Sequence, residues 1–253
     1  MKLRPEQLER YSRFLRLYDF TEEDQLTLSR TTVSMVGAGG IGSPVLRLLA
    51  SLGFGRIRII DGEDVELSNI QRQNIYNTRD VGKKKAECAA ANLNLMNPEV
   101  EFIPIVQRIG NNNAKEILKG SSLIVDGLDS FQARHAVNEV SVKLGIPYVF
   151  AGAVEYFANL STFIPGKTGC LNCLMGTAKD HPDGTASSIG VSPELLSVVA
   201  GIEAREAMLV ALMRKANLEG RLMTIDISTL SFDVFDIARS ETCGVCGHLS
   251  PEE

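Results

Sequence analysis

The sequence predicts an α/β fold: a Rossmann-like, doubly wound and mostly parallel sheet that continues into an antiparallel part. Two observations predict it. Short apolar segments alternate with helical segments from residue 32 to residue 151, which is typical of parallel strands covered by helices on both faces. The first of these segments leads directly into a glycine-rich turn and a helix. With 253 residues, 44% of them hydrophobic and 23% charged, the chain has the balance of one large globular domain.

The expected elements follow in chain order. Residues 4–30 are charged with scattered leucine and aromatic residues, and they predict one or two amphipathic helices. Parallel strands are expected where short apolar runs occur, at 32–36, 56–60, 100–105, 123–125 and 148–151. The helices that connect them are expected between the glycine turn and Gly53, at 83–96, at 114–118 and at 131–144.

From about residue 155 the pattern changes. A strand at 159–164 is followed by a loop over 167–191, and a long helix then begins after Ser192 and runs to about residue 215. Two closely spaced strands, 222–227 and 231–235, predict a hairpin. We therefore expect three regions within one domain: N-terminal helices (1–30), a nucleotide-binding Rossmann-like region (31–154) and a C-terminal region (155–253).

The charge of the chain excludes partners that are held by general electrostatic attraction. Its 26 basic and 31 acidic side chains give a net charge of −5, so neither nucleic acid nor an anionic membrane is expected as a partner. No apolar stretch is long enough to span a bilayer, and the first residues lack the apolar core of a signal peptide. We expect a cytoplasmic protein whose five cysteines are reduced or metal-bound rather than paired as disulfides.

The glycine-rich turn has the spacing of a phosphate-binding loop. Gly37, Gly39, Gly40 and Gly42 contain a G-x-G-x-x-G pattern between a predicted strand and a predicted helix. Glycines let the backbone approach a phosphate, and the helix N-terminus favours the anion. Asp61 ends the second strand, where a carboxylate can accept hydrogen bonds from ribose hydroxyls. A tight turn with a capping aspartate has the same residues, and the pattern does not separate a dinucleotide from a mononucleotide.

Two further segments favour an anion with more charge than a dinucleotide carries. Asn69, Arg72 and Gln73 share one face if their turn is helical, and a guanidinium suits phosphate oxygens. Three successive lysines, 83–85, open the next predicted helix against its dipole, which a bound polyphosphate would offset. Each segment is also typical of a solvated polar surface.

Asp129 follows the fourth predicted strand, and Arg134 lies five residues further along. Ligands gather at the carboxyl ends of strands in such sheets, and a carboxylate there can hold Mg²⁺ together with substrate phosphates. Asp129 is also suited to cap the helix that follows. Together with the glycine turn, Arg72 and Lys85, these residues predict a triphosphate site rather than a hydride-transfer site.

Four of the cysteines form two C-x-x-C pairs, Cys170/Cys173 and Cys243/Cys246. Four thiolates in two knuckles match a closed tetrahedral Zn²⁺ site of structural type. The long segment between the pairs means that the metal would clip the C-terminal tail onto the body of the protein. Thiol–disulfide redox chemistry and two inert pairs are the alternatives.

Taken in order, these motifs resemble the ThiF/MoeB/HesA family of ATP-dependent adenylyltransferases, which is related to ubiquitin-activating enzymes. The resemblance covers residues 8–247 and rests on RYSRF at 10–14, GAGGIG at 37–42, Asp61, SNIQRQ at 68–73, VGKKK at 81–85, the D-x-x-x-x-R of Asp129 and Arg134, and the two C-x-x-C pairs.

The resemblance implies that ATP adenylylates the C-terminal Gly-Gly carboxylate of a small ubiquitin-fold sulfur carrier, as in molybdopterin or thiamine biosynthesis, with release of pyrophosphate. A separate donor then supplies sulfur. By similarity, Asp61 binds ribose, Asp129 holds Mg²⁺, and Asn69, Arg72 and Lys85 contact phosphates. Arg13 would reach the nucleotide of a partner subunit, which implies a homodimer, and the region 155–253 would bind the carrier and zinc. The expected catalytic residues are Arg13, Arg72, Lys85 and Asp129.

The chain departs from the family pattern in two places. Ala186 stands where many relatives carry a cysteine, so a covalent thioester is not expected there, and Ser130 follows Asp129 where asparagine is usual. Three alternatives to the implied function remain: an NAD-dependent oxidoreductase, a non-catalytic zinc-stabilised binding scaffold, and the same chemistry on a different acceptor.

Overall fold

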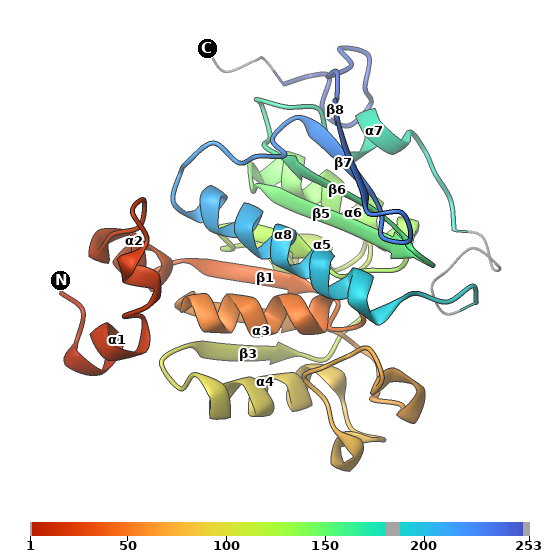
Figure 1. The fold of residues 1–253 in the computed structure, drawn as a ribbon. Coiled ribbons are helices and arrows are strands. Elements are labelled where there is room, and N and C mark those ends of the chain that lie inside the picture. Colours follow the sequence, from red (N-terminus) through yellow and green to blue (C-terminus); the bar gives the residue numbers. More distant parts are fainter. Residues whose placement is uncertain (1, 181–187, 250–253) are drawn as a thin grey trace.

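Over residues 2–180 and 188–249, which the computed structural model describes, eight strands form one mixed sheet (Figure 1). The strand order is β3-β2-β1-β4-β5-β6-β7-β8. The pairs from β3 to β5 are parallel, and those from β5 to β8 are antiparallel. The predicted fold class is therefore confirmed. The strands are β1 (Thr32–Val36), β2 (Arg56–Ile60), β3 (Glu101–Ile105), β4 (Leu123–Asp126), β5 (Tyr148–Val154), β6 (Phe157–Phe163), β7 (Arg221–Asp226) and β8 (Ser231–Asp236).

Helices cover both faces of the sheet (Figure 1). Because successive strand residues point to opposite faces, Met35 and Ile59 pack in one core with α3, α4 and α8, while Val36 and Ile60 pack in a second core with α5 and α6. The described helices are α1 (Pro5–Arg10), α2 (Glu22–Leu28), α3 (Gly42–Leu52), α4 (Lys85–Met96), α5 (Ala114–Leu118), α6 (Phe131–Leu144), α7 (Leu171–Met175) and α8 (Pro193–Ala211), with the 3₁₀ turns η1 (Phe14–Arg16), η2 (Leu67–Asn69) and η3 (Thr78–Asp80).

Three differences from the predictions concern helices. Helix α4 begins at Lys85 rather than at residue 83, because Lys84 has an extended backbone and forms an isolated bridge to Asp64. Helix α8 ends at Ala211, since Met213 adopts a positive φ of 54° that a right-handed helix cannot continue. The predicted loop after β6 contains the short helix α7, which begins directly after Cys170.

The N-terminal helices lie at the end of the molecule away from the glycine turn (Figure 1). Tyr11 receives a hydrogen bond of 3.1 Å from Asn97 at the end of α4. Gln25 on α2 donates to the carbonyl of Leu52 at the end of α3, at 3.0 Å. This segment therefore closes the C-terminal ends of α3 and α4. Within the described residues, no helix is both long enough and apolar enough to cross a membrane.

Candidate functional site

The glycine turn after β1 packs directly against the turn after β4. Gly37 has a φ of +89°, and a Cβ atom built there would lie 2.5 Å from the carbonyl oxygen of Gly127. A Cβ on Gly42 would lie 2.0 Å from the carbonyl oxygen of Gly37. Only glycine fits either position, because any side chain would overlap backbone. The predicted phosphate loop and the turn that leads to Asp129 thus form one continuous surface at the carboxyl ends of the strands.

Asp61 lies at the end of β2 and orients the glycine loop. One carboxylate oxygen accepts the backbone N–H of Ala38 at 2.9 Å, and the other accepts that of Glu63 at 2.8 Å. Burial raises the pKa of Asp61, while these two hydrogen bonds and nearby Lys85 oppose the rise. A carboxylate oxygen has more than one lone pair, so both oxygens keep capacity for a further donor such as a ribose hydroxyl.

The segment after β2 brings Arg72 and Gln73 to the same loop. An ideal Cβ on Gly39 would lie 3.7 Å from the amide nitrogen of Gln73, and one on Gly40 would lie 3.9 Å from Cδ of Arg72. The Gln73 side chain is buried, and its carbonyl oxygen has no hydrogen-bond partner among the described residues. A buried unpaired acceptor is costly, which favours a donor from a ligand at this place.

The rest of this segment is held by local bonds. Asn69 is buried and accepts the backbone N–H of Glu66 at 3.1 Å. The Arg72 guanidinium donates to the carbonyl oxygen of Ser68 at 2.9 Å. Because Asn69 closes the turn that carries Arg72, its role in this structure is to fix the backbone of the segment.

Lys85 is the one member of the lysine run that is buried. Its ammonium lies 2.8 Å from a carboxylate oxygen of Glu63, and Arg108 lies 3.2 Å from the other oxygen. The hydrogen bond from Lys85 lowers the pKa of Glu63 despite partial burial. Lys84 pairs with Asp64 at 2.7 Å outside the helix. The prediction that three lysines open the helix was therefore wrong, since only Lys85 belongs to it.

Glu63 and Arg108 were missed by the sequence analysis. Both lie near the carboxyl ends of neighbouring strands, Glu63 two residues after Asp61 and Arg108 three residues after β3 ends at Ile105. That location was the available signal, because charged residues just beyond parallel strands line the ligand edge of such sheets.

Asp129 and Arg134 occupy different environments. Asp129 is exposed at the start of α6, and within the described residues its carboxylate has no hydrogen bond or ion pair. A free carboxylate at this edge fits one ligand of a Mg²⁺ ion that also takes phosphate oxygens. Arg134 is buried and paired with Asp126 at 3.1 Å. Its guanidinium is committed to protein partners, which favours a supporting role over direct contact with a nucleotide.

Ser130 caps α6 and binds Asp180 in the segment that follows α7. Its hydroxyl accepts the backbone N–H of Ala133 at 3.4 Å and donates to the carboxylate of Asp180 at 2.8 Å. The departure at Ser130 thus provides a cap and an anchor for the following segment. Ala186, the other departure, lies outside the described residues.

Arg13 lies on the exposed N-terminal segment just before η1. That segment packs at the end of α3 that is opposite the glycine turn (Figure 1). A helix of the length of α3, at about 1.5 Å per residue, separates the two by roughly 16 Å. Arg13 therefore does not meet the glycine loop of its own chain.

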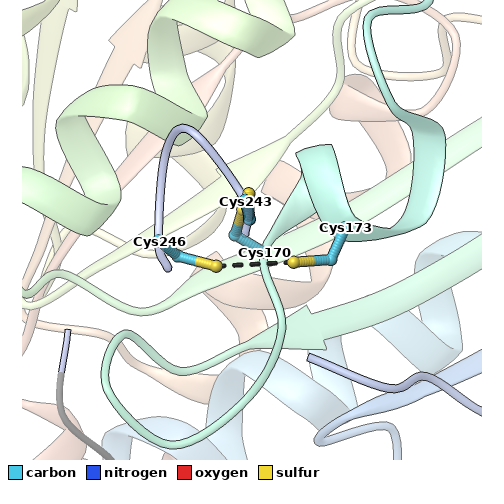
Figure 2. Close-up of side chains that lie close together, drawn as sticks. All are labelled: Cys170, Cys173, Cys243 and Cys246. Atoms are coloured by element: carbon cyan, nitrogen blue, oxygen red, sulfur yellow. Dashed lines mark hydrogen bonds between the residues drawn. The ribbon is translucent and has the colours of Figure 1, made fainter. Parts of the chain in front are cut away.

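The four cysteines meet between α7 and the C-terminal tail (Figure 2). All four Sγ atoms lie within 4.8 Å of one another. The Cys170–Cys243 and Cys173–Cys246 sulfur distances are 3.8 Å and 3.4 Å, close to the edge of about 3.8 Å that a tetrahedron of Zn–S bonds of ~2.3 Å requires. None of the four forms a disulfide.

The surroundings of the sulfurs shift their pKa values in different directions. Burial raises the pKa of Cys170 and Cys246. Burial alone would raise that of Cys243 also, but hydrogen bonds from the backbone of Cys246 and Val245 and from the other thiols lower it to about 7. The backbone N–H of Ser240 lies 3.5 Å from Sγ of Cys173. The cluster can hold a metal ion, and the donor set fits zinc.

A doubly wound sheet with a glycine loop and opposed charged groups at its carboxyl edge belongs to the class of Rossmann-like nucleotide-binding folds. The sequence profile of the ThiF family matches residues 11–245. The chain therefore belongs to the ThiF family, as its motifs predicted.

Known proteins similar to this chain indicate which class of enzyme it is. It is 37% identical to the sulfur carrier protein adenylyltransferase of Thermus thermophilus, over 98% of this chain and 93% of that protein. It is 36% identical to the SAMP-activating enzyme E1 of Haloferax volcanii, over 95% of this chain and 89% of that protein. The crystal structure of Escherichia coli MccB with ATP superimposes with a TM-score of 0.83 at 26% identity, over 94% of this chain and 74% of that chain. The chain is an adenylyltransferase, and the oxidoreductase and scaffold alternatives are set aside.

Proposed function

We propose that this protein uses ATP and Mg²⁺ to adenylylate the C-terminal Gly-Gly carboxylate of a ubiquitin-fold sulfur carrier. The observation that carries the proposal is the direct contact between the glycine loop and the turn of Asp129, with Arg72, Gln73 and Asp61 around the same loop. This arrangement offers backbone and cationic groups to a triphosphate and a carboxylate to its metal. The name of the Thermus thermophilus relative, sulfur carrier protein adenylyltransferase, supports this acceptor.

In the proposed reaction, a carboxylate oxygen of the carrier attacks the α-phosphorus of ATP. The new bond joins that oxygen to phosphorus, the bond from the α-phosphorus to the bridging oxygen breaks, and pyrophosphate leaves with its electron pair. No base is needed, because the attacking carboxylate is ionised at neutral pH. The difficulty is the approach of two anions, so catalysis depends on positioning and on positive groups already in place.

Each residue then has a defined task. Asp61 accepts hydrogen bonds from the ribose hydroxyls, and Arg72 and Lys85 neutralise the phosphates. Asp129 is the carboxylate that would hold Mg²⁺, which when bound neutralises phosphate charge. The ion pair with Glu63 holds the ammonium of Lys85 at the edge of the site, where it would contact the phosphates. Arg108, bound to the other oxygen of Glu63, supplies a further positive charge there.

The remaining parts of the proposal concern assembly. Cys170, Cys173, Cys243 and Cys246 would hold a structural Zn²⁺ that joins the tail to α7. Arg13 is remote from the glycine loop of its own chain, so it would contact the nucleotide bound to a second copy in a homodimer. A separate donor would supply sulfur to the adenylated carrier in the cytoplasm.

The test is ATP–pyrophosphate exchange by the zinc-loaded protein, with and without small carriers that end in Gly-Gly. Exchange that depends on both the carrier and Mg²⁺ is the expected result, and a carrier lacking its last glycine is the control. Mass spectrometry should find the carrier heavier by one adenylate. If no ubiquitin-fold carrier supports exchange but a short peptide does, the acceptor is a peptide rather than a sulfur carrier.

A further inference from the structure

The turn between β4 and α6 has almost no freedom in its backbone. The N–H of Gly127 donates to the carbonyl of Val36 at 2.7 Å. A Cβ on Gly127 would lie 2.7 Å from the carbonyl oxygen of Gly37 and 2.9 Å from Cα of Gly42. Asp129 comes two residues later, so any shift of this turn moves its carboxylate relative to the glycine loop.

A buried ion pair holds the turn from below. Asp126 accepts the N–H of Leu128 at 2.7 Å and pairs with Nε of Arg134 at 3.1 Å. Arg134 also donates to the carbonyl oxygens of Leu128 and, at 2.9 Å, of Ala151 on β5. The hydroxyl of Tyr148 donates to the same carboxylate oxygen of Asp126 that Arg134 contacts.

Arg134 is buried between two aromatic rings. Its guanidinium carbon lies 5.2 Å from the centre of the Phe150 ring and 5.7 Å from that of Phe131. Burial alone would lower the pKa of Arg134, but the charge and hydrogen bond of Asp126, together with nearby Tyr148 and Asp129, raise it overall. The charge of Arg134 is therefore used inside the protein.

A second buried group approaches the turn from the opposite face of the sheet. Glu203 on α8 is fully buried, and one of its carboxyl oxygens accepts the N–H of Asp126 at 3.2 Å. Its other oxygen has no hydrogen-bond partner among the described residues. Such a group is costly in a core, and its one bond falls on the last residue of β4 before the turn.

We infer that Arg134 and Glu203 are positioning residues that set the carboxylate of Asp129 against the glycine loop. Arg134 holds the turn through the carbonyl of Leu128, and Glu203 holds the residue at which the turn begins. The inference rests on the proposed function, because Asp129 needs this placement only if it serves Mg²⁺ and a nucleotide. In place of the predicted membership of Arg134 in the nucleotide site, the inference gives this residue an indirect role.

Arg134→Lys is the main variant, because lysine keeps a positive charge beside Asp126 but cannot also reach the carbonyls of Leu128 and Ala151. With zinc-loaded protein, we expect the exchange rate at saturating ATP and Mg²⁺ to fall about 10²-fold, as a displacement of ~1 Å at a reacting centre produces. The half-saturating Mg²⁺ concentration should rise at least about fivefold, while the KM for ATP changes less than about threefold, since Arg134 does not touch the nucleotide.

Glu203→Gln and Glu203→Leu form a matched pair. Glutamine keeps an acceptor oxygen for the N–H of Asp126, so Glu203→Gln should retain a rate of ATP–pyrophosphate exchange near that of the native protein. Leucine has no acceptor, so Glu203→Leu should lower this rate at least about tenfold. A readout independent of activity is amide hydrogen exchange at residues 127–130 in the nucleotide-free protein. It should be faster in Arg134→Lys and Glu203→Leu, and unchanged in Glu203→Gln.

Other outcomes would overturn the inference. A native rate and native Mg²⁺ dependence in Arg134→Lys would do so, and so would a rise in the KM for ATP alone, which would make Arg134 a nucleotide ligand. If Arg134→Lys does not fold, equal activity of the two Glu203 variants is the refuting result. Absence of exchange by the native protein would instead refute the proposed function, and amide exchange would still decide the positioning.

Discussion

Replacing Glu203 by glutamine is expected to change how the stability of the protein depends on pH. Glu203 is fully buried, and burial together with nearby Asp126 raises its pKa well above the ordinary value. In the unfolded chain a glutamate ionises near pH ~4.3. Above that pH the unfolded chain has released a proton that the folded protein keeps. The free energy of unfolding therefore falls as pH rises, until the raised folded pKa is reached.

The size of the effect follows from the linkage. While Glu203 stays protonated in the folded protein, its contribution falls by about 1.4 kcal/mol per pH unit. Glu203→Gln removes this titration. Between two pH values at which Glu203 stays protonated in the folded protein, the free energy of unfolding of Glu203→Gln should therefore gain about 1.4 kcal/mol per pH unit relative to the native protein. Any fixed cost of the extra amide hydrogens is the same at both pH values and cancels in this difference.

Urea unfolding, followed by circular dichroism at several pH values between 5 and 6.5, measures the effect. Glu203→Leu is the matched control, because it removes the same titration. Its change with pH should equal that of Glu203→Gln, while its stability is lower by about 1–3 kcal/mol throughout, since the N–H of Asp126 loses its acceptor. A difference between Glu203→Gln and the native protein that stays constant with pH would mean that Glu203 is ionised in the fold, and the reasoning would fail.

Three other changes test the site. Lys85→Ala should slow ATP–pyrophosphate exchange by about 10²-fold because the phosphates lose a fixed cation, and Lys84→Ala, on the exposed side, is the control; equal rates would remove Lys85 from the site. Gly37→Ala should lower the free energy of unfolding in urea by at least ~2 kcal/mol, since alanine at positive φ costs about 1–2 kcal/mol and its Cβ overlaps Gly127; a native value would contradict the close approach. If the four cysteines hold zinc as proposed, Cys246→Ser should contain less zinc than the native protein by elemental analysis, and an equal zinc content would exclude a four-thiolate site. Its free energy of unfolding should also fall by about 4 kcal/mol if the metal joins Cys173 to Cys246, 73 residues further along the chain, as a cross-link does.

The sequence by itself determined the features that depend on local backbone geometry or on the types of side chain that bind a metal. The spacing of Gly37 and Gly42 predicted a tight strand-to-helix turn, because only a residue without a side chain allows the backbone to pass so close. The two C-x-x-C pairs predicted a four-thiol cluster, because the spacing within each pair brings two sulfurs to one centre wherever the pair lies. The alternation of apolar runs with helical segments was enough for the parallel half of the sheet.

Only the tertiary structure decided how the charged residues divide between the site and the core. Arg134 and Asp129 belong to one short motif, yet packing buries the first under Phe150 and leaves the second exposed. Glu203 lies 77 residues from Asp126 along the chain, and its contact with the turn depends on how α8 crosses the sheet. Burial and the pairing of distant charges arise from packing between elements, and no local pattern of residues encodes them.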